Sequence, residues 1–405
     1  MARLFNLSAL LGVIVALAPS SEGVATANKQ VEVPRELTYN LPQTFHSDLA
    51  QGFLGGTVTT SKKTQRLLKE AYNANFVIYD DEFKDILGKN PTLELVAQDD
   101  EVVAYEGGLW VADRDEVWMT SSVVVYNRTW ISILKLKDNT IHTPSFHGDD
   151  FVTPNGGYYF NGTAYFGTVG NVTSPAGVVG INPRTKEVTT VVNSYFGLNF
   201  NFIDDVAWTR RCGKNYMFFT DYGTPAVFPG VANKGKLQIA NAVWRFDPQD
   251  ATLMPVILRS EVAAPNGVRV NADGTKLFVG DYSLTSVIGA ANETFGGPSV
   301  IEYDLDEDAR PVNKRPFFMA RDAAVDGIHL DDFGRVWTAE DDAISVRDKK
   351  GKLLGSINTW NLRENSTVPV VANFALAGDR LVVLASTRIW VVKLGQQLVS
   401  GGDLS

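Results

Sequence analysis

The chain contains very little cysteine. Its 405 residues include one, Cys212, so the chain can form no internal disulfide. Small secreted domains rely on disulfides because their cores are small, whereas a chain of this length buries enough apolar surface without them. We therefore expect Cys212 to lie in a turn and to be incidental to the fold and to the function.

Positive charge and long apolar runs are also scarce. The formal net charge is −9, and no cluster of five or more Lys and Arg residues occurs. Proteins that bind nucleic acids present a basic patch to the phosphates, so the sequence argues against a nucleic-acid partner. After the first residues of the chain, no segment is long and apolar enough to span a membrane.

The N-terminus has the features of a secretory signal peptide. Arg3 precedes an apolar stretch of about 14 residues (4–17), and residues 16–18 or 25–27 offer a cleavage site. A membrane anchor is the alternative, but a spanning helix needs ~20 residues. We expect residues 1–27 to be removed and the rest to be secreted, without membrane association. Secretion would expose five Asn-X-Ser/Thr sequons to N-glycosylation, at Asn127, Asn161, Asn171, Asn292 and Asn365.

A hairpin pattern occurs six times along the chain. Each copy has a polar residue, a short alternating strand, a tight turn rich in Asp, Asn and Gly, and a second strand, as in "APNGVRVNADGTKLFVGD" over residues 264–281. The leading polar residues are 49, 49, 62, 60 and 47 residues apart: Glu106, Asn155, Asp204, Asn266, Asp326 and Asn373. Such a period is typical of propeller blades. The sequence predicts an all-β fold, a six-bladed β-propeller with four-stranded antiparallel blades.

The remaining segments complete this domain organisation. We expect the propeller to span residues 75–396, after an irregular N-terminal segment over 28–74 and before a C-terminal tail over 397–405. Helical periodicity is confined to residues 64–75. The segment "NFVIYDDEF", from Asn75, is expected to pair with the C-terminal "TRIWVVKLG" and so to close the ring of blades without a free edge.

The register of the six polar residues predicts a metal site. The first strand of each blade lines the channel of a propeller, so the residues that precede these strands meet at one channel mouth. Neighbouring carboxylates repel one another, and a bound cation removes the conflict. Carboxylate and amide oxygens suit a hard cation such as Ca²⁺, although another divalent cation is possible. Two alternatives are that the Asn and Asp residues only stabilise turns, and that the ion is purely structural.

Four segments resemble the gluconolactonase, regucalcin (senescence marker protein) and paraoxonase-like propellers, and most of all the fungal secreted lactonohydrolases. They are "FVIYDDEFKDILGKNP", "PNGGYYFNG", "APNGVRVNADGTKLFVGD" and "VDGIHLDDFGRVW", within a resemblance over residues 75–395. The resemblance implies that Glu106, Asn266 and Asp326 hold a divalent metal. The third-blade position usually reads Asn-Asp in this family and in this chain reads Asp204-Asp205. Asp204 is a fourth candidate ligand whose role this departure leaves open.

The resemblance also implies a reaction, the hydrolysis of a sugar-type or other small lactone to its hydroxy acid. In that reaction the metal polarises the lactone carbonyl, and a carboxylate accepts a proton from the attacking water. The candidate catalytic residues are Asp326, as the base, and Glu106.

Five further residues are expected to contact the substrate: Asn155, Asn373, His329, Tyr222 and Tyr282. The two tyrosines lie in the longest intervals between repeats, which also carry Phe228 and Phe295. Such an aromatic rim favours a lactone less polar than a bare sugar lactone. The alternative is that the rim only packs the loops together, and that His329 belongs to the core.

Two other functions remain open from the residues alone. The first is an enzyme of another reaction type on the same scaffold, such as ester or phosphotriester hydrolysis or the tailoring of a secondary metabolite. The second is a binding propeller without catalytic activity that holds a structural ion. The sequence indicates no oligomeric state.

Overall fold

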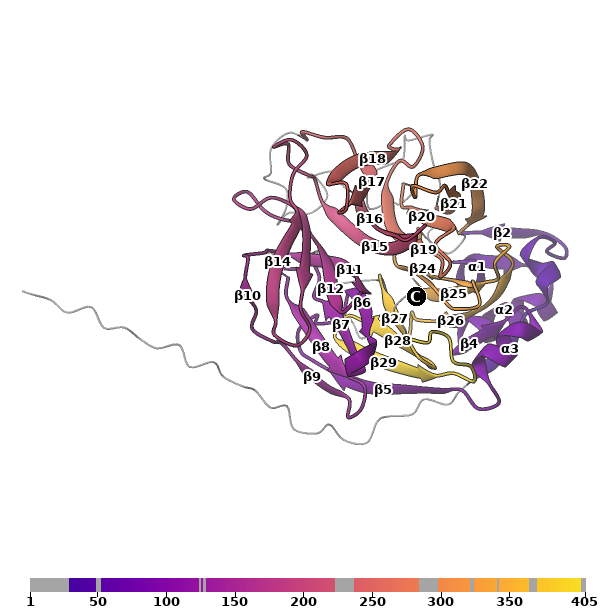
Figure 1. Ribbon diagram of the computed structural model, residues 1–405. Helices are drawn as coiled ribbons and strands as arrows, with labels where there is room; N and C mark the ends of the chain where they lie inside the picture. Colours follow the sequence, from indigo (N-terminus) through magenta and orange to yellow (C-terminus); the bar gives the residue numbers. More distant parts are fainter. Residues whose placement is uncertain are drawn as a thin grey trace, which may run out of the picture.

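Six mainly antiparallel sheets surround a central channel in the computed structural model. The structure describes residues 29–48, 52–123, 125–126, 129–222, 237–283, 298–320, 324–340, 342–363 and 370–401. The colours of Figure 1 follow the chain around the ring, one blade after another. The expected six-bladed propeller with mostly four-stranded blades is therefore confirmed.

The first four blades consist of consecutive strands, ordered from the channel outward. Blade 1 contains β6 (Glu106–Val111), β7 (Glu116–Thr120), β8 (Ile131–Lys135) and β9 (Thr140–His142). Blade 2 contains β11 (Pro154–Phe160), β12 (Thr163–Thr168), β13 (Gly177–Ile181), β14 (Glu187–Val192) and the short β10 (His147–Gly148). Blade 3 contains β15 (Ile203–Arg211), β16 (Lys214–Asp221), β17 (Ala242–Asp247) and β18 (Thr252–Leu258). Blade 4 contains β19 (Pro265–Val270), β20 (Lys276–Asp281), β21 (Ser299–Leu305) and β22 (Pro311–Met319).

The last two blades combine strands from both ends of the chain. Blade 5 contains β23 (Ile328–Leu330), β24 (Val336–Glu340), β25 (Ala343–Arg347) and β26 (Leu353–Asn358), extended by β4 (Phe76–Ile78) and β1 (Gln30–Glu32). Blade 6 contains β27 (Phe374–Ala377), β28 (Arg380–Ala385), β29 (Arg388–Lys393) and β5 (Thr92–Gln98). The pairing of β5 with β29 closes the ring, so no blade is left incomplete.

The strand that closes the ring is not the one expected. The segment that begins at Asn75 forms β4, which pairs with β26 of blade 5. The chain then turns into helix α3 (Asp81–Leu87), because the side chain of Asp80 accepts a hydrogen bond from the Glu82 amide and caps the helix. The acidic residues that follow β4 thus begin a helix, and the next strand, β5, closes the ring of blades.

The segment 28–74 was expected to be irregular, and this was wrong for its described part. It contains β1, the short helix η1 (Arg35–Thr38), β2 (Phe45–Ser47), α1 (Phe53–Gly56), β3 (Thr57–Thr59) and α2 (Lys62–Tyr72). The side chain of Asn358 donates to the carbonyls of Ala71 and Ala74 at the end of α2, and Trp360 stacks on Tyr72 with ring centroids 4.6 Å apart. These contacts attach the N-terminal segment to blade 5. The proposed domain boundaries themselves stay predictions.

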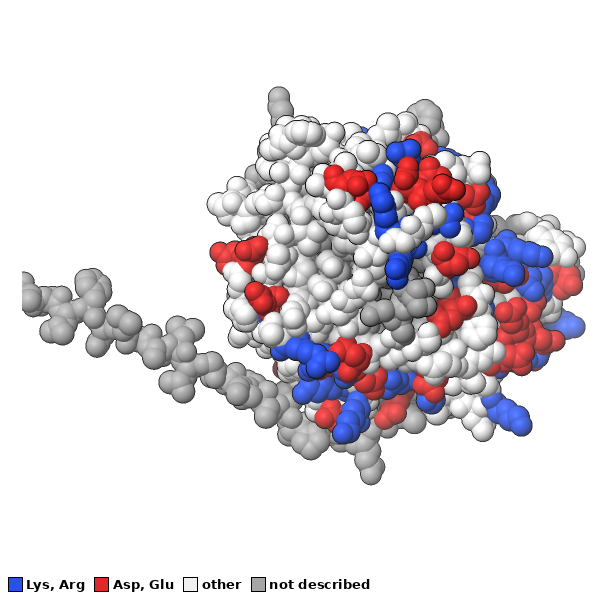
Figure 2. Space-filling view, in the orientation of Figure 1, with Lys and Arg blue, Asp and Glu red and all other residues white. Residues whose placement is uncertain are grey.

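Three expectations concern the single cysteine, membrane spans and surface charge. Cys212 is exposed in the turn between β15 and β16, as expected. None of the helices in the described part of the chain has the length and apolar character that a membrane span requires. On the face shown in Figure 2, basic side chains are interspersed with acidic ones, and the described residues form no basic stripe there. The absence of a nucleic-acid partner stays a prediction.

Candidate metal and substrate site

The six polar residues that the repeats placed in register lie together at one end of the channel. Each stands at or just before the start of the innermost strand of its blade, and each is only 1–8% exposed: Glu106, Asn155, Asp204, Asn266, Asp326 and Asn373. We call them the polar ring. Acids and amides alternate around it in chain order. An amide therefore stands between successive acids in chain order, while the acids still interact with one another across the ring.

Hydrogen bonds join neighbours in the polar ring. Asn155 Nδ2 donates to Asp204 Oδ1 at 2.9 Å, and Asn373 Nδ2 donates to Glu106 Oε2 at 3.0 Å. The carboxyl groups of Glu106 and Asp326 also lie close enough to interact directly. Two charged carboxylates in such proximity repel each other, so this contact favours a shared proton or a bound cation.

Glycine residues next to the ring allow its members to approach so closely. A Cβ at Gly267 would lie 2.3 Å from the carbonyl oxygen of Asp326, and one at Gly327 would lie 2.4 Å from Asn373 Oδ1. A polar residue followed by glycine occurs in four of the six copies, at residues 106, 155, 266 and 326. This dipeptide is a further sequence signal for the ring, independent of the spacing between the repeats.

The electrostatics of the polar ring favour a cation. Burial raises the pKa of the Glu106 carboxyl to about 7, and the charge of Asp205 adds to this while the Asn373 hydrogen bond opposes it. Burial and the nearby Glu106 and Asp205 raise the pKa of Asp204 well above its usual range. These buried acids are therefore poorly compensated by the surrounding protein, and a positive ion would stabilise their charged forms.

Two unpaired amide oxygens point to the same conclusion. Asn155 Oδ1 and Asn266 Oδ1 are buried, and neither has a hydrogen-bond partner among the described residues. A buried acceptor without a donor is costly unless an ion or water satisfies it. Within the described residues, no group of three His, Cys, Asp or Glu side chains alone is placed to hold a metal. The donors that fit a hard cation are thus the mixed set of acids and amides.

A buried ion pair lies next to the polar ring, and the sequence patterns did not predict it. Arg269 Nη1 lies 2.6 Å from Asp205 Oδ2, and the two side chains are each 4% exposed. The amide of Val268 also donates to Asp205 Oδ2. The second acid of the Asp204-Asp205 pair is therefore engaged by blade 4, and Asp204 alone belongs to the polar ring. The sequence feature that could have indicated this ion pair is the single Arg within the apolar strand "VRV".

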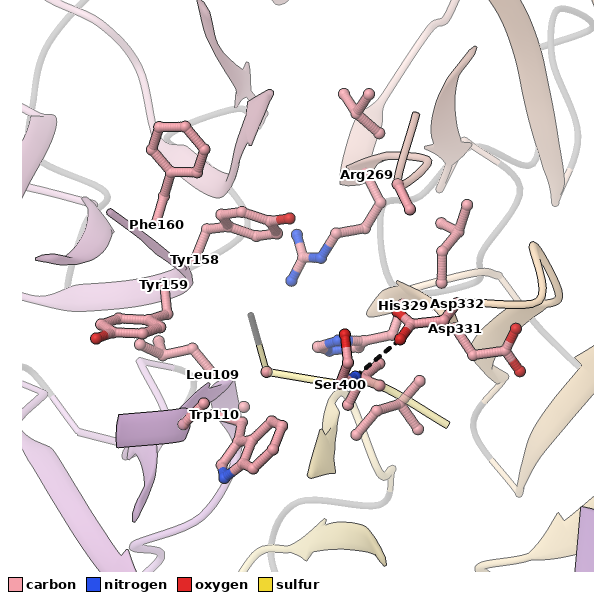
Figure 3. Close-up of a pocket in the computed structure, with 18 of the residues that line it drawn as sticks. Leu109, Trp110, Tyr158, Tyr159, Phe160, Arg269, His329, Asp331, Asp332 and Ser400 are labelled. Carbon is pink, nitrogen blue, oxygen red and sulfur yellow. Dashed lines mark hydrogen bonds between the residues drawn. The ribbon is translucent and has the colours of Figure 1, made fainter. Parts of the chain in front are cut away.

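The channel continues beyond the polar ring into a cavity of about 690 Å³. We call it the second cavity, to distinguish it from the channel mouth at the polar ring. Figure 3 shows Tyr158, Arg269 and His329 pointing into this cavity. Ser400 also lines the cavity, and its backbone amide donates a hydrogen bond to the side chain of Asp332. His329 was expected to contact the substrate at the channel mouth. It instead lines this second cavity, and its Nε2 lies 3.2 Å from Asn373 Oδ1.

The two rim tyrosines come together near the polar ring. Tyr222 and Tyr282 contact each other edge to face, with ring centroids 6.1 Å apart, in a cluster with Phe202 and smaller apolar residues. Burial raises the pKa of Tyr222, and the charges of Asp204 and Asp326 add to this rise, so the phenol lies close to the ring. Phe228 and Phe295 lie outside the described residues.

Two of the five predicted glycosylation sites lie in the described part of the chain. Asn161 is exposed in the turn between β11 and β12. Asn171 is half-buried, and its side-chain oxygen accepts from the amides of Thr173 and Ser174. Asn127, Asn292 and Asn365 lie outside the described residues. Glycosylation at any of these positions stays a prediction.

The fold and the polar ring define a six-bladed propeller with a buried oxygen-rich site at one channel mouth. The region described as "SMP-30/Gluconolactonase/LRE-like" matches residues 172–381, just over half of the chain. The chain belongs to this family, as the resemblance of its motifs predicted. Four members of the polar ring lie within the matched region, whereas Glu106 and Asn155 precede it.

Individual proteins extend the likeness over more of the chain. Lactonohydrolase oryL of Aspergillus oryzae is 24% identical over 345 residues, which cover 79% of this chain and 74% of that protein. Among solved structures, a gluconolactonase from Xanthomonas campestris has a TM-score of 0.62 at 19% identity and covers 78% of this chain and 94% of its own. Regucalcin from Agrobacterium tumefaciens, described as calcium-binding, has a TM-score of 0.51 at 13% identity and covers 75% and 93%. These structural matches support the fold.

Proposed function

We propose that the chain is a secreted, Ca²⁺-dependent lactonase that hydrolyses a small lactone to its hydroxy acid. The polar ring carries this proposal, because its buried acids and unpaired amide oxygens form a donor set for a hard cation. Glu106, Asn266 and Asp326 would hold the ion, and Asp204 is the candidate fourth ligand. The three acids by themselves form no metal-binding group among the described residues, so the Asn266 amide oxygen is needed to complete the site. The lactonohydrolases and gluconolactonases that the chain resembles support hydrolysis of a lactone as the reaction.

The reaction follows from what each group can do. A bound Ca²⁺ supplies Lewis-acid chemistry by polarising the lactone carbonyl and stabilising negative charge on its oxygen. Asp326 accepts the proton of the water that attacks the carbonyl carbon. The ring C–O bond then breaks, and Asp326 returns the proton to the departing alkoxide. Glu106, whose carboxyl group lies next to that of Asp326, would hold the ion beside this base.

The apolar rim supports a substrate less polar than a bare sugar lactone. Tyr282 is half-buried and packs against the buried Tyr222, so Tyr282 is the rim tyrosine that presents an aromatic surface beside the polar ring. Burying apolar area contributes roughly 25 cal/mol per Å², which favours a lactone with an alkyl or aryl substituent. The substrate contacts expected of Asn155 and Asn373 stay predictions, because their Nδ2 atoms already donate to Asp204 and Glu106.

Secretion is part of the proposal and has a separate test. It is supported by the charged and apolar pattern of residues 3–17 and by the exposed sequon at Asn161. Sequencing the N-terminus of the protein recovered from culture medium should give a start near residue 19 or residue 28. Retention of the protein in the cell with an intact N-terminus would contradict this part of the proposal.

The activity is tested with lactones, a chelator and a matched pair of variants. The purified protein should acidify a lactone solution, lose this activity with chelator and regain it with Ca²⁺. Asp326→Asn should reduce kcat by at least about 100-fold, because general base catalysis contributes typically 10²–10⁴-fold. Asp250→Asn is the control, since its side chain is 58% exposed in a surface ion pair with Lys214, and it should retain full activity.

Two outcomes would overturn the proposal in different ways. Hydrolysis that resists the chelator would contradict the dependence on a metal. Tight Ca²⁺ binding without turnover of any alkyl, aryl or sugar lactone would instead indicate another reaction on the same scaffold, or a binding protein with a structural ion.

A further inference from the structure

A chain of hydrogen bonds runs from the polar ring to the second cavity. Asn373 is 1% exposed, and its Nδ2 donates to Glu106 Oε2 at 3.0 Å. Its Oδ1 accepts from the Phe374 amide at 2.9 Å and lies 3.2 Å from His329 Nε2. These contacts join blades 1, 5 and 6 through one side-chain amide.

The partners of Asn373 determine which way its amide faces. An amide oxygen only accepts hydrogen bonds, whereas the nitrogen only donates them. In the observed orientation the nitrogen faces the Glu106 carboxylate and the oxygen faces two donors. A flipped amide would place its oxygen against the carboxylate and its nitrogen against the Phe374 N–H. The Phe374 amide and the Glu106 carboxylate therefore favour this orientation, and His329 adds a second donor at Oδ1.

The protonation of His329 follows from this contact. Asn373 Oδ1 is an acceptor, so the neutral tautomer that satisfies this contact carries its proton on Nε2. Burial and the nearby Arg269 lower the pKa of His329 well below its usual value, so the ring is neutral at neutral pH. The ring also packs on Phe374, with centroids 4.7 Å apart. His329 is held on both sides in a position where it can donate to Asn373.

Close packing leaves Asn373 no alternative position. A Cβ at Gly327 would lie 2.4 Å from Asn373 Oδ1 and 3.0 Å from the carbonyl of Ala372. A Cβ at Gly108 would lie 2.1 Å from the carbonyl oxygen of Phe374. The backbones of blades 1, 5 and 6 therefore pack closely around the Asn373 amide.

We propose that His329 is a positioning residue, which orients the Asn373 amide so that Asn373 holds one carboxylate oxygen of Glu106 in place. His329 then acts on the candidate metal site from the side of the second cavity, without contact to the substrate. The inference rests on the proposed function in taking Glu106 as a metal ligand. Mutation of an outer partner that orients a metal ligand typically weakens metal affinity by 10–100-fold.

The first arm of the test measures Ca²⁺ affinity by calorimetry after removal of bound metal. His329→Leu removes the donor and should raise the Kd by about 10-fold. His329→Gln restores a donor at the position of Nε2 and should recover most of that loss. If Gln binds no better than Leu, His329 contributes packing only and the proposal is wrong.

A double-variant comparison tests whether the effect passes through Asn373. In an Asn373→Ala background, His329→Leu should change the Kd by less than about twofold, because the intermediate group is gone. The same 10-fold loss in both backgrounds would contradict the proposal. These comparisons require that the parent protein binds Ca²⁺, and failure of the parent to bind would instead contradict the proposed function.

The second arm does not depend on metal. The chain has four histidines, so 15N spectra of histidine-labelled protein in chelator can be assigned by comparison with His329→Gln. The His329 ring should be neutral with its proton on Nε2, and the Asn373→Ala substitution should alter that signal. A proton on Nδ1, or a charged ring at neutral pH, would overturn the proposal whether or not the protein binds metal.

Discussion

Replacement of Arg269 by Met tests the buried ion pair beside the polar ring. The Arg269 and Asp205 side chains are each 4% exposed, with Nη1 and Oδ2 2.6 Å apart. The same Nη1 donates to the carbonyls of Val206 and Val268, and Nη2 donates to the carbonyl of Gly157. Met retains much of the side-chain volume of Arg but provides none of these donors.

The expected cost has two parts. Removing one partner of a buried ion pair leaves an uncompensated charge and typically costs 3–5 kcal/mol. The carbonyl oxygens that lose their donor add to this cost, although relaxation of the backbone reduces their share. The Asp205→Asn substitution removes the uncompensated charge. Adding it to Arg269→Met should therefore recover about 1–3 kcal/mol, within the usual range of coupling energies for residues in contact.

Unfolding by urea in the presence of chelator measures these free energies without a contribution from metal binding. Arg310→Met is the matched control, because Arg310 and Asp308 form an ion pair that is more than half exposed, and such pairs contribute at most about 1 kcal/mol. A loss below about 1 kcal/mol for Arg269→Met, or no recovery in the double variant, would refute the reasoning.

Three other variants test the ring and its rim. Asn266→Ala removes a buried, unpaired amide oxygen and should raise the Ca²⁺ Kd by at least about 10-fold in calorimetry, whereas Ala at the exposed Asn40 should change nothing. Gly327→Ala places a Cβ 2.4 Å from Asn373 Oδ1 and should lower the free energy of unfolding by about 1–3 kcal/mol, a prediction that a neutral substitution would contradict. Tyr282→Ala should raise KM for an aryl-substituted lactone while leaving that for a sugar lactone unchanged, and equal effects on both would count against the apolar rim.

The register of the polar ring could be predicted because it depends on local sequence. Each copy of the hairpin pattern carries its own turn residues and its own alternating strand, so the start of each inner strand can be read from the chain. A propeller then brings those starts together by its symmetry. Residues as far apart as Glu106 and Asn373 were therefore expected around one channel mouth, where the structure has them.

The contacts that organise the site could not be predicted in the same way. Asp205 and Arg269 are 64 residues apart, and His329 and Asn373 are 44 apart. Their pairing depends on the side-chain directions of neighbouring blades, which no local pattern specifies. The closing strand was misassigned for a related reason. The apolar segment β4 and the alternating segment β5 both read as strands, and neither pattern specifies the strand with which it pairs.

A crystal structure of the protein grown in millimolar Ca²⁺, with anomalous scattering to locate the ion, tests the proposed metal site most directly. We predict one ion at the polar ring, with oxygens of Glu106, Asn266 and Asp326 at about 2.3–2.6 Å. A ring without an ion under these conditions, or calcium bound only elsewhere on the protein, would contradict the proposal.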